Sequence, residues 1–270
     1  MNKKKLFDYN LEILQVSQLA AISVFDFIGK KDETAADKAA VESMRKELNK
    51  INFKGTIVIG EGERDKAPML YIGEKVGNGN ALEVDIALDP LEGTRITATN
   101  EKNALTALAV GDKNSFLHAP DVYMEKIAIG PNLPNTFLDL DMPLEETLEN
   151  IAKYKKKRIS DIAVCVLNRP RHKKIFDILD KFSCKKLLIP DGDIAGVLAR
   201  TLCRDHAVLG LQKPSHHVQH ARLHRRFAPV DSVGCERRVG GHEEMRAWCW
   251  DQGCHHPDEI VVHVAWISQR

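Results

Sequence analysis

The chain has 270 residues, of which 43% are hydrophobic and 29% are charged, a composition typical of globular proteins and unlike that of disordered or fibrous ones. Its 39 Lys and Arg residues balance 38 Asp and Glu residues, so no net field attracts nucleic acid or an anionic membrane, and we expect neither as a partner. No apolar run is long enough to span a bilayer and the basic start of the chain lacks a secretion-signal cleavage site, so we expect the protein to be cytoplasmic.

The first 200 residues alternate between helical and strand-like patterns. A second helix is expected over residues 35–48, with Thr34 as its N-cap. Strands mixed with helices predict a layered α/β domain. The first helix, ending near Gly29, is predicted from residues that recur at spacings of three and four: Phe7, Leu11, Leu14, Gln18, Ile22 and Phe25. Strands are predicted from short β-branched runs at 55–60, 84–88, 105–110, 162–167 and 187–189.

The composition of the chain changes abruptly near residue 200. Residues 1–200 contain 23 Lys, 7 Arg and 13 Asn, whereas residues 201–270 contain one Lys, 8 Arg and no Asn. Nine of the eleven histidines and all three tryptophans lie in the last 70 residues, and no polar or Pro/Gly-rich linker precedes them. We therefore interpret residues 1–200 as the functional body and residues 201–270 as an atypical tail of frame-shifted or foreign sequence. A second domain of different origin is the alternative.

Carboxylates gather directly after the first two predicted strands. Glu61, Glu63 and Asp65 follow the first strand, and Asp89 and Glu92 follow the second. One such cluster is most simply a solvated loop, but carboxylates crowded at one end of a sheet raise one another's pKa unless a cation neutralises them. Hard divalent cations such as Mn²⁺ or Mg²⁺ take oxygen ligands. Two clusters in these positions therefore predict a site for such a metal.

The second cluster, Asp89-Pro90-Leu91-Glu92-Gly93-Thr94, also suits a phosphate group. Asp89 and Glu92 can both point toward one metal-binding region, and Pro90 restricts the turn between them. Gly93 lets the backbone approach an anion closely. Thr94 offers a hydroxyl and a backbone N–H where a helix is expected to begin.

This segment resembles the Asp-Pro-(Ile/Leu)-Glu-Gly-Thr signature of class II fructose-1,6-bisphosphatases, which belong to the lithium-sensitive, metal-dependent phosphatase superfamily. Further blocks similar to those of the family follow in the expected order at 57–63, 67–74, 119–126 and 190–193, and the resemblance covers about residues 10–200. It implies the layered α/β sugar-phosphatase fold of the inositol-monophosphatase/fructose-bisphosphatase type, with the C-terminal part truncated or replaced. It also implies a small sugar bisphosphate as the substrate, and a homo-oligomer is compatible with it.

The resemblance implies a role for each matching residue. The implied metal ligands are Asp37, Glu61, Asp89 and Glu92, with Mn²⁺ or Mg²⁺ as the cofactor. The implied catalytic residues are Thr94 and Asp37, which orient or deprotonate a water, with Glu63 and Asp65 as supporting groups behind the ligands. The arginines can grip phosphate with several N–H donors. The implied substrate contacts are Glu92, Gly93, Thr94, Tyr123, Arg169, Pro170, Arg171, Asp191, Gly192 and Asp193.

The reaction that the resemblance implies is metal-assisted hydrolysis of fructose 1,6-bisphosphate to fructose 6-phosphate and phosphate, a step of gluconeogenesis. Sedoheptulose 1,7-bisphosphate is the alternative substrate. Family members continue with a Gly-Gly-Ala-Pro-Glu-Gly segment, whose glutamate completes the metal site, and nothing like it follows Arg200. The alternative is therefore a catalytically inactive, truncated remnant that binds metal or sugar phosphate weakly.

The tail offers two further patterns. Its histidines and cysteines include zinc-ligand residue types, but the gap between Cys249 and Cys254 does not match a zinc knuckle. Residues 261–267 predict a strand, or an aggregation-prone segment if that strand stays unpaired.

Overall fold

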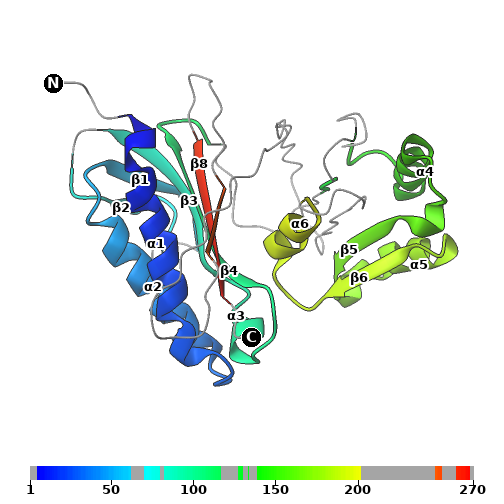
Figure 1. Cartoon of the computed structure of the whole chain (residues 1–270), viewed down its shortest axis with the longest axis horizontal. Helices are drawn as coiled ribbons and strands as arrows, with labels where there is room; N and C mark the ends of the chain where they lie inside the picture. Colours follow the sequence, from blue (N-terminus) through cyan, green and yellow to red (C-terminus); the bar gives the residue numbers. More distant parts are fainter. Residues whose placement is uncertain are drawn as a thin grey trace. The chain divides into compact units, whose positions relative to one another are not determined.

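A computed structural model describes residues 5–61, 70–79, 82–116, 127–129, 133, 139–201, 247–250 and 260–267. The chain divides into two compact units (Figure 1). Unit 1 comprises residues 1–121 and 230–270, and unit 2 comprises residues 122–229. The change of composition near residue 200 falls inside unit 2, so it does not coincide with this structural division.

Unit 1 is built on a six-stranded sheet in the order β2-β1-β3-β4-β8-β7. β1 and β3 run parallel, whereas the other neighbouring strands pair antiparallel. The carboxyl ends of β1 and β3 therefore lie at one edge of the sheet. The strand bounds are β1 (Lys54–Ile59), β2 (Lys75–Val76), β3 (Glu83–Glu92), β4 (Ala104–Asp112), β7 (Ala247–Trp250) and β8 (Ile260–Ile267).

Two helices, α1 (Asn10–Ser23) and α2 (Glu33–Leu48), cover one face of this sheet (Figure 1). Asp32 rather than the predicted Thr34 is the N-cap of α2, because its side chain accepts the backbone N–H of Ala35 at 2.9 Å. Shorter helical segments are η1 (Leu6–Tyr9), η2 (Phe25–Phe27) and α3 (Thr94–Ala98).

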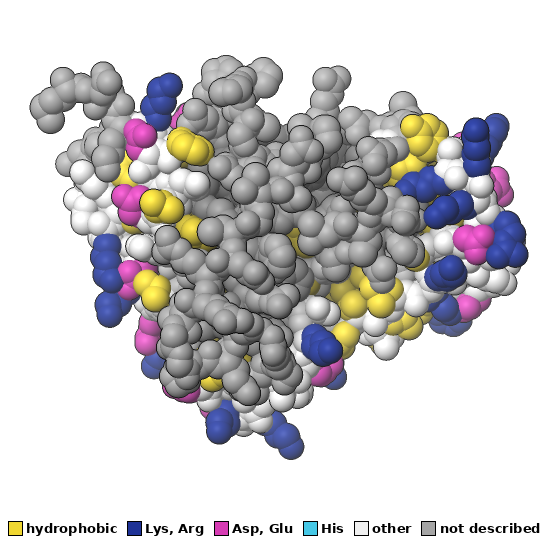
Figure 2. Space-filling view, viewed as in Figure 1, with side chains coloured by type: hydrophobic (Ala, Val, Ile, Leu, Met, Phe, Trp, Pro, Cys, Tyr) yellow, Lys and Arg dark blue, Asp and Glu magenta, His cyan; other side chains and the backbone are white. Residues whose placement is uncertain are grey.

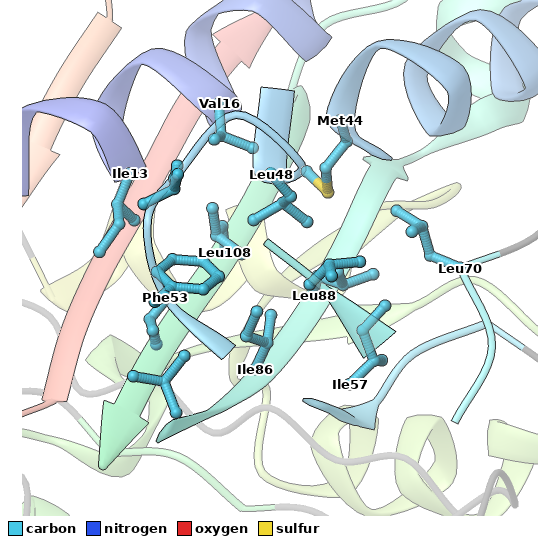
Figure 3. Close-up of a cluster of buried hydrophobic side chains, with 14 of the residues drawn as sticks. Ile13, Val16, Met44, Leu48, Phe53, Ile57, Leu70, Ile86, Leu88 and Leu108 are labelled. Carbon is cyan, nitrogen blue, oxygen red and sulfur yellow. The ribbon is translucent and has the colours of Figure 1, made fainter. Parts of the chain in front are cut away.

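The core of unit 1 lies between these helices and the sheet (Figure 3). Val84, Ile86 and Leu88 of β3 all belong to it, as the two-residue period of a strand requires for one buried face. Burial of this apolar surface is the main favourable contribution to folding of the unit. Other members of the core are Ile13, Val16, Met44, Leu48, Phe53, Ile57, Leu70 and Leu108.

The buried face of α1 differs from the stripe predicted from its sequence. Phe7, Leu11 and Ile22 are 53%, 68% and 39% exposed, and Figure 2 shows hydrophobic side chains at the surface over this helix. The spacing of the large side chains selected the wrong face because α1 is apolar on both sides. The face that packs on the sheet consists of Ile13, Val16, Ser17, Ala20 and Ala21.

The last described segment of the tail forms β8, so the predicted strand is confirmed and is paired. β8 lies antiparallel to β4 through eight residue pairs, from Ala104 opposite Ile267 to Gly111 opposite Ile260. Ala265 and Ile267 are buried in a cluster with apolar residues of α1, α2 and α3. The tail therefore contributes to the core of unit 1.

Unit 2 contains a two-stranded parallel sheet, β5 (Ala163–Leu167) and β6 (Lys185–Ile189). The predicted strands at 162–167 and 187–189 are confirmed, and with unit 1 they confirm the α/β class. The helices of unit 2 are α4 (Leu144–Lys155), η4 (Ile159–Asp161), η5 (Pro170–His172), α5 (Lys173–Lys181) and α6 (Asp193–Thr201). Among the described residues of the whole chain, no helix is long and apolar enough to cross a bilayer.

Candidate functional site

Asp89 and Glu92 lie within β3 rather than in a loop beyond it, which corrects the position expected from the sequence. Asp89 pairs with Ala107 and Glu92 with Leu105 on β4, and the register shifts between these pairs. This irregularity is a β-bulge at Pro90, a residue that has no N–H to give to a ladder. A bulge re-aims side chains, so it sets the directions of the two carboxylates that flank it.

Two hydrogen bonds hold this bulge. Asp89 Oδ1 accepts the backbone N–H of Leu91 at 3.1 Å. Thr106, which is fully buried on β4, donates its hydroxyl to the carbonyl of Pro90 at 2.9 Å. The second bond satisfies a carbonyl that the bulge removes from the strand ladder.

Gly93 and Thr94 make the turn from β3 into α3. Gly93 has φ +97°, a left-handed conformation that glycine adopts readily. A Cβ at this position would lie 2.7 Å from Cδ1 of Ile96, so the turn needs both the freedom and the small size of glycine. Thr94 is the first residue of α3, two residues after Glu92 at the end of β3, and is half-buried.

Glu61 lies at the same edge of the sheet as Asp89. Ile59, the last residue of β1, is paired with Ala87 of β3, so the chain leaves β1 toward Glu61 beside the part of β3 that leads to Asp89. The backbone N–H of Glu61 donates to the carbonyl of Leu70 at 2.9 Å, and its side-chain atom Oε2 is buried. The topology therefore brings two predicted metal ligands, one just beyond β1 and one within β3, to the same end of these parallel strands.

Asp37 approaches Asp89 from the helical layer. It lies in the second turn of α2 and is half-buried. Burial of the Asp37 carboxyl raises its pKa above the ordinary value, and the negative charge of Asp89 raises it further. Both effects disfavour the ionised form, so a cation placed beside these two carboxylates would lower that pKa.

Of the four predicted metal ligands, Asp37 and Asp89 are close enough for the charge of Asp89 to raise the pKa of Asp37, and the four do not form a closed set. Within the part of the chain that the structure describes, no three His, Cys, Asp or Glu side chains form a group that could hold a metal ion as they stand. Their chemistry nevertheless fits a hard divalent cation, because all of them offer carboxylate oxygen atoms.

In unit 2, two predicted substrate-binding loops follow the carboxyl ends of parallel strands. Leu167 of β5 is paired with Ile189 of β6, so the loop at Arg169 and the loop at Asp191 start at the same edge. Nη2 of Arg169 and Oδ1 of Asp191 lie 3.8 Å apart. Each of these side chains keeps about a quarter of its surface exposed, at 27% and 28%, which leaves both accessible to a ligand.

The other predicted residues of unit 2 shape these loops. Pro170 and Arg171 belong to η5, and Arg171 is half-buried. Gly192 has φ +79° and turns the chain into α6, whose first residue is Asp193. Tyr123, Glu63 and Asp65 lie outside the described residues.

Sequence reasoning missed His172, which follows Arg171 directly and is fully buried. A lone histidine has no periodic pattern, and the only available signal was its place beside the predicted phosphate-binding turn.

Comparisons with known proteins extend these observations. Residues 8–210 match a protein family described as bacterial fructose-1,6-bisphosphatase, glpX-encoded. Fructose-1,6-bisphosphatase 1 class 2 of Escherichia coli K12 is 49% identical over 185 residues, which cover 68% of this chain and 55% of the relative. The class 2 fructose-1,6-bisphosphatase of Haemophilus influenzae is 48% identical over 186 residues, 69% of this chain and 56% of the relative. The chain thus spans about half the length of these curated relatives.

A longer alignment includes part of the tail. The D-fructose 1,6-bisphosphatase class 2/sedoheptulose 1,7-bisphosphatase of Synechococcus is 36% identical over 273 residues, covering 93% of this chain and 78% of the relative. Residues 1–200 are less than three quarters of the 270, so this alignment extends beyond them. Among solved structures, an extragenic suppressor from Pyrococcus furiosus matches with a TM-score of 0.36 and 11% identity, over 71% of this chain and 70% of that one.

Proposed function

Since the chain belongs to the family of bacterial, glpX-encoded fructose-1,6-bisphosphatases, we propose that it hydrolyses fructose 1,6-bisphosphate to fructose 6-phosphate and phosphate. The matched range, residues 8–210, includes every residue predicted for the site. The observation that supports the proposal is the parallel pairing of β1 with β3, in which the last residue of β1, two residues before Glu61, is paired two residues before Asp89 on β3. Carboxylates near the same end of two parallel strands are suited to bind a cation next to a phosphate.

We assign metal binding to Asp37, Glu61, Asp89 and Glu92, with Mn²⁺ or Mg²⁺ as the ion. The raised pKa of Asp37 beside Asp89 supports this assignment, because two carboxylates this close favour a shared cation. When bound, such ions supply charge neutralisation at the phosphoryl group and lower the pKa of a water. The carboxylates would need side-chain rotations to converge on an ion, since the described acids do not form a ligand group as they stand.

Thr94 and Asp37 are proposed to handle the attacking water. The hydroxyl of Thr94 orients the water, and a carboxylate oxygen of Asp37 accepts its proton. The water oxygen then forms the new bond to phosphorus while the bond from phosphorus to the sugar oxygen breaks, and the departing sugar oxygen takes a proton from solvent. The half-burial of both side chains supports this role, because it limits competition from bulk water.

Substrate binding is proposed for the loops of unit 2. Arg169 and Arg171 anchor a phosphate group, and binding energy at that remote group helps to align the reacting one. Asp191 and Asp193 accept hydrogen bonds from sugar hydroxyls, and Gly192 permits the turn between them. Tyr123 donates its hydroxyl to a phosphate in this proposal, which for this residue has only the family resemblance as support.

The finer parts of the proposal concern the cellular role. Gluconeogenesis, a cytoplasmic location and a homo-oligomeric state belong to it, and the exposed apolar side chains of α1 support an oligomer. Sedoheptulose 1,7-bisphosphate is the alternative substrate, which the name of the Synechococcus relative supports.

A catalytically inactive remnant is the second candidate. The chain corresponds to 55% of the Escherichia coli relative, and the proposed frame-shifted or foreign origin of residues 201–270 would remove one metal ligand of the family. Such a remnant would bind metal or sugar phosphate weakly without turnover.

A phosphate-release assay with fructose 1,6-bisphosphate and Mn²⁺ separates the two candidates. We expect turnover by the 270-residue chain and a fall of at least about a hundredfold in Asp89→Asn, because a metal ligand is lost. Glu42→Gln, which alters an exposed carboxylate on α2, is the control and should retain full activity. Absence of turnover in a folded wild-type chain would favour the remnant.

A further inference from the structure

His172 is a buried polar residue that the proposed reaction does not use. It has no exposed surface, and its ring meets that of Phe176 edge to face, with centroids 6.4 Å apart and planes at 86°. An imidazole without contact to water needs a hydrogen-bond partner inside the protein, because burial of a polar group is unfavourable unless it is hydrogen-bonded.

The partner is a backbone carbonyl at the end of β5. His172 Nδ1 lies 2.7 Å from the carbonyl oxygen of Leu167. A carbonyl only accepts, so the imidazole is the donor and Nδ1 carries the proton. Nε2 is buried and has no hydrogen-bond partner among the described residues, so a second proton there would also be buried without an acceptor. The geometry therefore selects the neutral ring with its hydrogen on Nδ1.

The same carbonyl organises the turn that carries the arginines. Leu167 O also accepts the backbone N–H of Arg169 at 2.9 Å, and Arg169 O accepts the backbone N–H of His172 at 2.9 Å. At the start of the turn, Asn168 donates its N–H to Ile189 O at 2.8 Å. The turn is thus hydrogen-bonded to the ends of both β5 and β6, and the buried imidazole adds one more hydrogen bond to the end of β5.

The charge state of the ring matters to the two arginines. Burial lowers the pKa of His172, the bond to Leu167 opposes this, and Arg171 and Arg169 lower the pKa further. A neutral donor can hold the turn without repelling guanidinium groups that must together meet a phosphate.

We infer that His172 is a positioning residue, which uses its Nδ1–H and its backbone N–H to hold Arg169 and Arg171 in the geometry that receives a phosphate group of the substrate. The inference rests on the proposed function for the identity of the ligand. The hydrogen-bonded turn itself stands on the structure of unit 2 alone.

The test compares two substitutions at this position by calorimetric titration of the full chain with fructose 1,6-bisphosphate, without divalent metal so that the substrate is not hydrolysed. His172→Asn keeps an N–H close to the place of Nδ1, whereas His172→Leu keeps bulk and removes the donor. We expect His172→Leu to raise Kd about tenfold, the effect of one lost buried hydrogen bond, and His172→Asn to restore most of the affinity. Leu179→Ala, a fully buried change in the core of unit 2, controls for loss of stability and should leave Kd within about twofold.

A second measurement does not depend on the ligand. Nitrogen NMR of the wild-type imidazole should show the proton on Nδ1, and amide exchange at Arg169 and His172 should be faster in His172→Leu than in His172→Asn. The inference is overturned if the proton is on Nε2, or if His172→Leu binds the sugar bisphosphate as tightly as wild type. If wild type does not bind fructose 1,6-bisphosphate at all, the proposed function fails, and the NMR and exchange results still decide whether His172 holds the turn.

Discussion

The turn at Gly93 shows how strongly one residue can constrain the acidic edge of the sheet. Gly93→Ala would impose a positive φ on an alanine and bring a Cβ within 2.7 Å of Ile96. We expect this variant to lose about 2–4 kcal/mol of unfolding free energy, from backbone strain plus overpacking. Urea denaturation measures the loss.

Gly73 provides a matched control for this prediction. It has φ +91°, but a Cβ there would meet nothing within 4 Å, so Gly73→Ala carries only the backbone strain of about 1–2 kcal/mol. Equal losses for the two variants would mean that the contact with Ile96 has no effect and that the turn relaxes around a side chain.

At the residue scale, the sequence predicted acidic residues near the ends of two strands but not the contacts that hold them. Glu61 and Asp89 follow β-branched runs, and that pattern predicted both just beyond strands; Glu61 does follow β1, whereas Asp89 lies within β3. The bulge at Pro90 and the buried hydroxyl of Thr106 that holds it depend on pairing with β4, a contact between distant parts of the chain. His172 was missed for the same reason, since its partner is set by the folded turn.

Between elements, α2 is tied to the segment before β2 by an ion pair. Arg45 Nε lies 2.6 Å from Oε1 of Glu74, and Nη2 lies 3.2 Å from Oε2. The side chains are only 28% and 11% exposed, so the remaining partner would be left poorly solvated. We expect Arg45→Met to lower the unfolding free energy by about 2 kcal/mol, above the typical value of a surface pair.

The exposed pair of Lys38 and Glu42 on the same helix is the control. These side chains are 58% and 59% exposed and 3.8 Å apart, so Lys38→Met should cost less than about 0.5 kcal/mol. Chemical denaturation of both variants gives the comparison. A loss at Lys38 as large as that at Arg45 would contradict the view that burial makes the difference.

The local sequence pattern predicted the positions of helices and strands more reliably than it predicted which of their faces is buried. Predicted strands and structural strands agree for β1, β4, β5 and β6 to within a few residues, because β-branched runs favour extended backbone. The face of α1 was predicted wrongly, since small residues such as Ala20 and Ala21 pack closely on the sheet and carry little signal in a hydrophobic pattern. Which face of α1 is buried therefore depends on tertiary packing.

On the scale of the whole molecule, the tail adds an edge to the sheet of unit 1. Ala265 of β8 is buried against residues of α1, α2 and α3. Ala265→Asp would place a carboxylate in this cluster, and we expect a loss of about 3 kcal/mol or more of unfolding free energy. Thermal and urea unfolding measure it. Unchanged stability would show that β8 does not pair with β4 in solution.

The composition of the tail predicted a segment unlike the body, and residues 261–267 predicted a strand. Its partner could not be predicted, because any β-rich segment can pair with an open strand edge and only the fold shows that β4 offers one. The division into two units at residues 121 and 229 was likewise not visible in the composition.

The account as a whole depends on carboxylates of unit 1 binding a divalent cation, and a titration of the full chain with Mn²⁺ followed by electron paramagnetic resonance tests this without any need for turnover. We predict that wild type and Glu42→Gln bind Mn²⁺ equally, and that Glu61→Gln weakens binding by about tenfold or more because a charged ligand is lost. Equal binding by Glu61→Gln and wild type, or no binding by wild type, would contradict the account.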